Sequence, residues 1–191
     1  KQLRPGADDH AEASLLLRQA VTRHGSEDLG LLSQLSGSLH AEGKLEASLQ
    51  ILRDALLARP EHRELLFALG SALERAGRWQ EAIATMQQIL KRRPKDAPAH
   101  NFIGYTQVDR GQDLKTAERS IRRALYLQPG EGYIIDSLGW LCFKQNRLAD
   151  ARRLLEMAVR LSPREPEVLG HLADVLATRV RRRCCHRSAR H

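Results

Sequence analysis

Histidine and cysteine are the residue types that most often carry acid–base, nucleophilic or metal chemistry. The sequence contains eight histidines and three cysteines. None stands in a catalytic spacing: there is no G-x-S-x-G turn, no H-E-x-x-H motif, no Walker phosphate loop and no G-x-G-x-x-G loop. We interpret the scattered His40, His62, His100 and His171 as surface or half-buried helix residues. The sequence therefore predicts no catalytic residue, no cofactor and no enzyme activity.

A second group of chemistry-bearing residues stands at the C-terminus, where Cys184, Cys185, His186 and His191 occur together. Adjacent cysteines do not form a C-x2-C loop, and the six arginines between 179 and 191 would repel a cation. We therefore predict no metal site. Three cysteines also make no disulfide framework, and Cys142 lies in an apolar helical pattern.

The net charge of +8, from 31 basic and 23 acidic side chains, is unevenly distributed. Six of the basic residues lie in 179–191 without any acid, which leaves 25 basic and 23 acidic side chains before that segment. We therefore expect no nucleic-acid binding by the folded part of the chain. We predict that 179–191 is a disordered basic tail, and contact with nucleic acid or a membrane surface through it stays an alternative.

The chain contains no apolar run of the roughly 20 residues that cross a bilayer. It begins at Lys1 and shows no signal-peptide pattern, so a leader or lipid anchor that precedes this segment is an open expectation. Membrane contact is expected only through such an anchor or through the basic tail.

The elements that must position any site follow a period of about 34 residues. Four prolines mark it, and so do four residues of the types that end helices in a left-handed conformation: Pro60, Pro94, Pro129 and Pro163; Gly43, Gly77, Gly111 and Asn146. Only 4% of the residues are aromatic and 28% are charged, which favours helices over a β-sandwich. Each glycine or asparagine is therefore predicted to form a tight turn between two helices.

Between these markers, apolar residues recur at helical spacing, with a small residue next to the central one. The first helices carry Leu32, Leu35, Ser36 and Leu39; Leu66, Leu69, Gly70 and Leu73; Ile103 and Gly104; Ile135, Leu138, Gly139 and Cys142; Leu169, Leu172, Ala173 and Leu176. The second helices carry Ser48, Leu52 and Ala55; Ala82, Met86 and Ile89; Ala117, Ile121 and Ala124; Ala151, Leu155 and Ala158. Small residues let two helix backbones approach closely, and the larger ones fill the space between neighbouring pairs.

This pattern resembles the tetratricopeptide repeat, W-x2-L-G-x2-Y followed by A-x3-F and a closing proline. The resemblance implies an all-α fold, a right-handed α-α superhelix of about four full repeats with partial repeats at both ends. The expected organisation is a second helix alone in 1–28, repeats at 29–62, 63–96, 97–131 (with one inserted residue) and 132–165, a final first helix at 166–178, and the tail. Both ends would expose apolar surface, so homo-oligomerisation through them is expected.

In such a fold, positions offset from the apolar ridge line a concave groove. The predicted peptide-binding residues are Phe67, Glu74, Asn101, Tyr105, Val108, Tyr133, Asp136, Trp140, Phe143 and Lys144. They give an aromatic floor and an acidic rim, which suit an apolar or mixed basic and apolar peptide with Tyr105 and Trp140 as anchors. The alternative for Trp140 and Phe143 is that they only pack against the next first helix.

A finer resemblance lies in Gly104-Tyr105, Asp109-Arg110, the run 136–140 and the run 171–176. These residues look like those of bacterial envelope repeat proteins, including lipoprotein adaptors that bring substrates to carboxy-terminal processing proteases. The resemblance implies a non-catalytic scaffold in the bacterial cytoplasm or on the periplasmic face of the envelope, binding a protein or peptide partner. The alternatives are a regulatory fragment of a larger enzyme, and a nucleic-acid or membrane-surface binder that acts through its basic tail.

Overall fold

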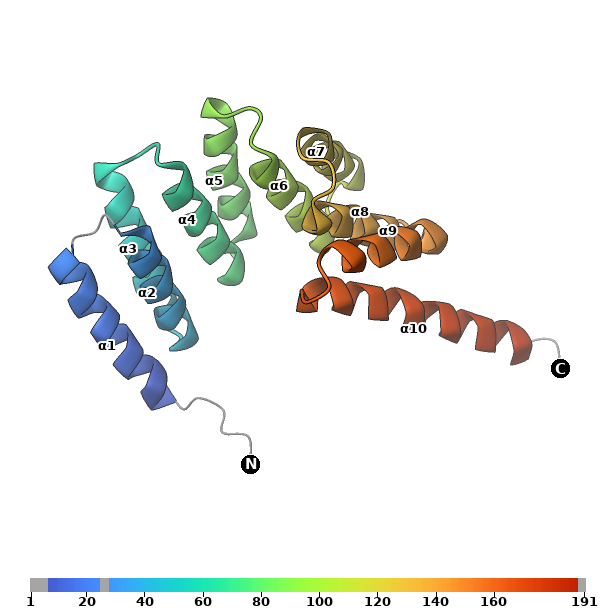
Figure 1. The fold of residues 1–191 in the computed structure, drawn as a ribbon, viewed down its shortest axis with the longest axis horizontal. Coiled ribbons are helices and arrows are strands. Elements are labelled where there is room, and N and C mark those ends of the chain that lie inside the picture. The colour runs from blue at the N-terminus through green and yellow to red at the C-terminus, as the bar shows by residue number, and fades with distance from the viewer. Residues whose placement is uncertain (1–6, 25–27, 189–191) are drawn as a thin grey trace. The chain divides into compact units, whose positions relative to one another are not determined.

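A computed structural model describes the backbone of residues 7–24 and 28–188. Across these two ranges the chain forms ten α-helices and no β-strand, so the fold is all-α as expected. The chain divides into two compact units, Lys1–Pro94 and Lys95–His191. Figure 1 shows that short connections join most successive helices.

The Lys1–Pro94 unit contains α1 (Ala7–His24), α2 (Leu29–Ala41), α3 (Leu45–Ala58), α4 (Arg63–Arg75) and α5 (Trp79–Arg92). Each helix packs against the next one in the chain, and α2 also lies beside α4. The first helices of two successive repeats are therefore direct neighbours in this unit.

The Lys95–His191 unit contains α6 (Ala97–Asp109), α7 (Leu114–Leu127), α8 (Gly132–Lys144), α9 (Leu148–Leu161) and α10 (Pro166–Ser188). Here α8 contacts both α6 and α10 in addition to its sequence neighbours α7 and α9. Three first helices, α6, α8 and α10, consequently form one layer, and residues from three repeats can meet on it.

The turns between paired helices have the predicted left-handed backbone. The φ angles are 77°, 77°, 63° and 65° at Gly43, Gly77, Gly111 and Asn146. The following amide donates back to the first helix, as from Arg78 to the Leu73 carbonyl at 2.8 Å, which is the hydrogen bond that closes such a helix end. The prediction of four equivalent turns is confirmed.

Three helices begin at an aspartate whose carboxylate accepts from free backbone amides of the first turn. Asp28 accepts from Leu31, Asp96 from Ala99, and Asp113 from Lys115 and Thr116. These bonds satisfy donors that a helix start otherwise leaves unpaired, and so they fix where α2, α6 and α7 begin.

The predicted apolar ridges of the second helices are buried throughout. At most 4% of each of these side chains is exposed: Ser48, Leu52 and Ala55; Ala82, Met86 and Ile89; Ala117, Ile121 and Ala124; Ala151, Leu155 and Ala158. Ser36 and Ser48, where the repeat usually has small apolar residues, hydrogen bond to each other at 2.8 Å, and Ser48 also donates to the Ser36 carbonyl. This pairing lets two hydroxyls occupy the core.

The backbones of α6 and α7 approach each other closely at Gly104. A Cβ atom on Gly104 would lie 2.9 Å from the Ala117 carbonyl oxygen and 3.1 Å from the Ile121 amide nitrogen. Real Cβ contacts are not that short, so only glycine fits there without moving backbone. The equivalent Gly70 faces the flexible end of Met86 instead, with the Met86 Cε 2.5 Å from such a Cβ.

The helix α10 is longer than expected. We predicted an end near Thr178 and a disordered tail from 179, but α10 continues to Ser188. No glycine or proline occurs between 171 and 188, and arginine, leucine and alanine are good helix formers. The remaining tail residues, 189–191, lie outside the described part of the chain. Leu169 and Leu176 are 44% and 39% exposed, because no described helix covers that face of α10.

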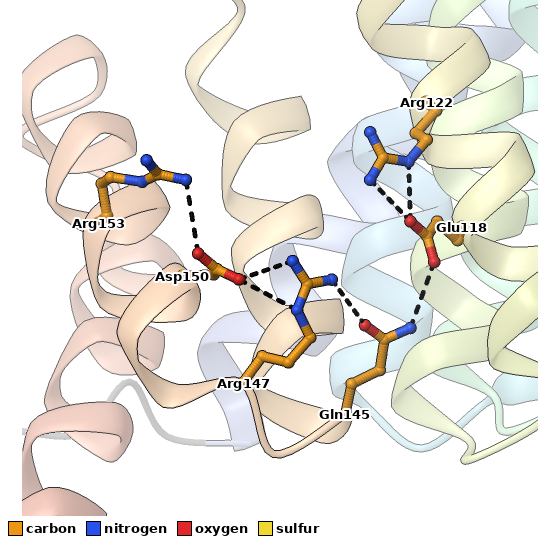
Figure 2. Close-up of polar contacts among 6 residues, drawn as sticks. All are labelled: Glu118, Arg122, Gln145, Arg147, Asp150 and Arg153. Carbon is orange, nitrogen blue, oxygen red and sulfur yellow. Dashed lines mark hydrogen bonds and ion pairs between the residues drawn. The ribbon is translucent and has the colours of Figure 1, made fainter.

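A chain of polar contacts joins α7 to the turn between α8 and α9 (Figure 2). Glu118 of α7 accepts from Arg122 at 2.7–2.8 Å and from the Gln145 amide at 3.3 Å. Arg147 donates to Gln145 at 3.2 Å and to Asp150 of α9 at 2.6 Å. These contacts hold one repeat to the next.

Candidate functional site

Side chains from three first helices meet in the Lys95–His191 unit. We call them the inner-face cluster: Tyr105 of α6, Asp136 and Trp140 of α8, and Glu167 and His171 of α10. Because these helices are neighbours, residues that are separated by one or two repeats in the sequence come within hydrogen-bonding or stacking distance.

The pair Asp136 and His171 forms the buried centre of the cluster. The side-chain nitrogen Nδ1 of His171 lies 3.0 and 2.9 Å from the two carboxylate oxygens of Asp136, and the residues are only 8% and 4% exposed. We assign the Nδ1–H group as the donor of this hydrogen bond, because a buried carboxylate oxygen needs a hydrogen-bond donor. The other ring nitrogen, Nε2, then faces the Tyr105 hydroxyl at 3.5 Å.

The Tyr105 hydroxyl donates to a Glu167 carboxylate oxygen at 2.5 Å. Burial raises the pKa of Tyr105 above its usual value, and the hydrogen bond to Glu167 and the nearby carboxylates raise it further. The hydroxyl therefore stays protonated, and it acts as a fixed donor between α6 and α10.

Trp140 lies beneath this network. Its ring stacks on His171 with centroids 4.1 Å apart and on Phe143 at 4.9 Å, and the Lys144 ammonium lies 4.8 Å from its centroid. Only 8% of Trp140 is exposed, and its indole nitrogen has no hydrogen-bond partner. The expectation of an exposed Trp140 anchor is therefore corrected: α10 covers α8 at this point, and His171 occupies the face of the ring.

Val108 needs a second correction. We expected it in the groove, but it is fully buried, in the same apolar cluster as Ala117 and Leu141. Three residues turn an α-helix by about 300°, so Val108 is rotated by about 60° from the direction of Tyr105. That rotation is enough to carry it from the inner face into the core.

A pocket of about 230 Å³ opens beside the cluster, and we call it the inner-face pocket. Its lining comes from α6, α8 and the segment that leads into α10: Asn101, Tyr105, Tyr133, Asp136, Ser137, Ser162, Glu165, Glu167 and Val168. Three of these residues are acidic and none is lysine or arginine. Asn101 is only 7% exposed, and its side-chain oxygen accepts no hydrogen bond. The pocket is thus a concave, acidic site lined by hydrogen-bond acceptors.

The predicted groove residues are placed as follows. Asn101, Tyr105, Tyr133 and Asp136 line the pocket, and Phe143 and Lys144 contact the Trp140 ring. Tyr133 is 38% exposed, and its hydroxyl donates to Gln128 at 3.3 Å. Phe67 and Glu74 belong to the Lys1–Pro94 unit, where both are half-buried on α4 and the Arg63 guanidinium lies 5.1 Å above the Phe67 ring.

Sequence reasoning missed the role of His171 and did not include Glu165 or Glu167 among the site residues. The missed signal is the repeat period, because Asp136 and His171 are 35 residues apart on adjacent first helices. An acid and a histidine one period apart, both in otherwise apolar surroundings, indicate a contact between repeats.

The described residues contain no group of three His, Cys, Asp or Glu side chains that could hold a metal ion. In the same part of the chain, no helix combines the length and the hydropathy that a membrane-spanning segment needs.

Comparison with known sequences agrees with this architecture. Two family profiles, both described as tetratricopeptide repeat, match residues 39–104 and 137–181. A TPR repeat-containing protein of Pseudomonas aeruginosa is 32% identical over 129 residues, which are 68% of this chain and 22% of that protein. The protein O-mannosyl-transferase Tmtc3 of Drosophila melanogaster is 26% identical over 71% of this chain and 15% of its own length. The chain thus spans less than a quarter of either relative.

Solved structures show the same fold. A TPR protein of Thermus thermophilus has a TM-score of 0.70 at 19% identity, with 89% of this chain and 92% of that one covered. YrrB, a TPR protein with an unusual peptide-binding site, has a TM-score of 0.56 at 16% identity, with 85% and 83% covered. With the four turns, the buried ridges and the two profile matches, these findings identify the chain as a tetratricopeptide repeat protein.

Proposed function

We propose that the chain is a non-catalytic interaction module that binds a segment of a partner protein, a peptide or a helix, on the inner face of α6, α8 and α10. The observation that carries this proposal is the inner-face pocket, a concave site that combines exposed tyrosine surface with a buried, unpaired Asn101 oxygen. Pockets with a few fixed polar groups and aromatic walls are typical of binding sites.

The buried part of the cluster supports this role by fixing the exposed part. Tyr105 is held by Glu167 on one side and lies against His171, whose ring is held in turn by Asp136 and Trp140. A side chain that is held in one conformation loses little entropy when a partner binds it. Tyr105 is therefore the anchor, and Trp140 is its support.

We further propose that the protein works as a scaffold or adaptor in a bacterial multiprotein complex, in the cytoplasm or at the periplasmic face of the envelope. The resemblance of residues 101–163 and of the run 171–176 to envelope adaptor proteins supports this, and so does the relation to the Pseudomonas aeruginosa repeat protein. The peptide-binding site named for YrrB supports a peptide as the partner's recognised part.

A second candidate function is a regulatory repeat segment of a larger enzyme. The relation to protein O-mannosyl-transferases favours it, since this chain corresponds to only 15% of the Tmtc3 length. The length of the complete reading frame distinguishes the two: a catalytic domain in the same chain would support the enzyme fragment and contradict the free-standing adaptor.

The binding proposal is tested with peptides selected on the immobilised chain from a random dodecapeptide display library. We expect Tyr105→Ala to weaken binding of the selected peptides by about 30-fold, the loss that follows removal of an aromatic anchor. Tyr105→Phe removes the hydroxyl but keeps the ring beside His171. Its affinity for the peptides therefore distinguishes the contribution of the hydroxyl from that of the ring.

Tyr126→Ala is the matched control, because Tyr126 is 77% exposed on α7 and does not line the pocket. Its binding should equal that of the unaltered chain. Selection of no peptide above background, or an equal loss in both alanine variants, would contradict the proposed site.

A further inference from the structure

We infer that the inner-face pocket receives a cationic side chain, lysine or arginine, from the bound segment. This inference rests on the proposed function and names the chemistry of the residue that the site recognises. Its basis is a convergence of acceptors on one concave space, with no basic residue among the lining side chains.

The charge of the pocket comes from three carboxylates. Asp136 lies on α8, Glu167 in the first turn of α10, and Glu165 just before that helix. Within the described residues, neither Glu165 nor Glu167 forms an ion pair with a lysine or arginine of this chain. Glu167 accepts one hydrogen bond, from Tyr105, and a carboxylate has room for several. The pocket therefore keeps negative charge and free acceptor capacity.

Asn101 supplies an independent indication of a bound donor. Asn101 is one of the residues that line the pocket, more than nine-tenths of it is buried, and its side-chain oxygen has no hydrogen-bond partner. An acceptor left unpaired in the interior opposes folding, and such groups are uncommon unless a ligand or water completes them. A donor that enters the pocket from the partner would complete Asn101.

Ammonium and guanidinium groups match these requirements because they carry only donors and a positive charge. Anionic side chains are excluded by the three carboxylates. A neutral amide would satisfy Asn101 but would leave the carboxylates without a counter-charge. The tyrosine rings of residues 105 and 133 offer apolar surface to the aliphatic stem of a lysine or the flat face of an arginine.

Two other sources of positive charge are too weak or absent. The N-terminus of α10 contributes a partial charge of only about +0.5 near Glu165 and Glu167, which does not neutralise two carboxylates. A metal ion is not supported, because no three ligand-type side chains of the described residues are close enough to hold one.

The first experiment uses the peptides selected on the full chain. We expect them to be enriched in lysine or arginine at one position, and replacing that residue, arginine by citrulline or lysine by glutamine, should weaken binding by about tenfold or more. The protein variant Glu167→Gln should cause a similar loss while its amide oxygen still accepts from Tyr105. Asp174→Asn is the matched control, because it removes one charge from the same helix at an exposed position outside the pocket.

The outcomes distinguish a failure of the cation inference from a failure of the proposed binding function. Peptides that lack a basic residue and bind wild type and Glu167→Gln equally would overturn this inference and leave the proposed function standing. No selected peptide at all would contradict the proposed function itself. An equal loss in Glu167→Gln and Asp174→Asn would show a diffuse charge effect, and it would overturn the pocket assignment.

The second experiment places the cation directly. Nα-acetyl-arginine N-methylamide and the corresponding lysine and citrulline compounds are titrated into the isotope-labelled chain and followed by amide resonances. The arginine and lysine compounds should shift the amide resonances of residues 101, 136 and 165–168 more than the citrulline compound does. Of the two charged compounds, the one that causes the larger shifts carries the side chain that the pocket prefers. Shifts of equal size with citrulline, or no shift at these amides, would contradict the inference.

Discussion

Two faces of α6 show how one helix can serve two purposes. The face towards α7 is apolar, and Gly104 lets the backbones of α6 and α7 come so close that a Cβ atom there would be 2.9 Å from the Ala117 carbonyl oxygen. The face towards α8 and α10 carries Asn101 and Tyr105, which line a pocket with acidic residues. On α6 the buried side-chain oxygens of both Asn101 and Gln107 accept no hydrogen bond, and of the two it is Asn101 that lines the inner-face pocket.

The difference separates stability from recognition. Apolar packing between paired helices depends only on volume and shape, so a small residue opposite a large one is sufficient. The inner face holds buried polar groups that cost free energy unless each is matched, and Asp136, His171, Tyr105 and Glu167 match one another. We propose that a donor from the partner pairs with Asn101, the unmatched acceptor that lines the pocket.

The largest effect on stability is expected at Trp140, which lies on the inner face but is buried like a core residue. We expect Trp140→Ala to lower the free energy of unfolding by about 3–5 kcal/mol, and Leu138→Ala by about 2–5 kcal/mol, because both remove packed side chains of the Lys95–His191 unit. Urea unfolding followed by circular dichroism measures this. Tyr126→Ala should change stability by less than about 0.5 kcal/mol. A Trp140→Ala variant as stable as that control would show that the ring is not part of the core.

The glycines of two equivalent positions test the apolar face. Gly104→Ala forces a Cβ against the Ala117 and Ile121 backbone, and we expect a loss of about 1–3 kcal/mol. Gly70→Ala meets the flexible end of Met86, while the nearest backbone atom, the Ala82 carbonyl oxygen, lies at an ordinary contact distance of 3.5 Å. The gain in helix propensity of up to about 1 kcal/mol should offset the contact with Met86. Thermal unfolding of the two variants gives the comparison. Equal losses would mean that the two helix pairs are packed alike.

The apolar face was predictable from the sequence because its determinants are local. Gly43, Gly77, Gly111 and Asn146 are types that adopt a positive φ, and each ends a first helix at the same place in the period. Ile121 and Leu155 follow a helical spacing within their own helices and are fully buried. Each of these features concerns one helix or one turn, so a single repeat contains the information.

The inner face was only partly predictable because it depends on how successive first helices are set against each other. The period predicted Tyr105 and Asp136 on the inner face, and both line the pocket there, but a rotation of about 60° put Val108 into the core. His171 reads as an ordinary helix residue until α10 is placed on α8, where its ring covers Trp140 and its Nδ1 meets Asp136. The extension of α10 to Ser188 has no apolar pattern, and only the absence of helix breakers could have indicated it.

A third kind of contact, the exposed polar chain of Figure 2, should have the smallest effect and should depend on pH. The hydrogen bond from Arg122 lowers the pKa of Glu118, and the bond from Gln145 lowers it further. A carboxyl whose pKa is depressed in the folded state adds stability above its unfolded pKa of about 4.3, and this stability is lost as the pH falls through the lower folded value. Because Glu118 is only half-buried and its partner Arg122 is exposed, Glu118→Gln should cost only about 0.5 kcal/mol at pH 7.

Urea unfolding at pH 7 and pH 3 measures this loss, and the difference in stability from wild type should shrink in acid. Glu156→Gln removes a comparable pair with Arg152 that stays within α9, so it isolates the part due to the bond between helices. A loss of stability in Glu118→Gln that is as large at pH 3 as at pH 7 would contradict this prediction. It would mean that Glu118 stabilises the fold through packing, as the apolar face of α6 does, and not through its charge.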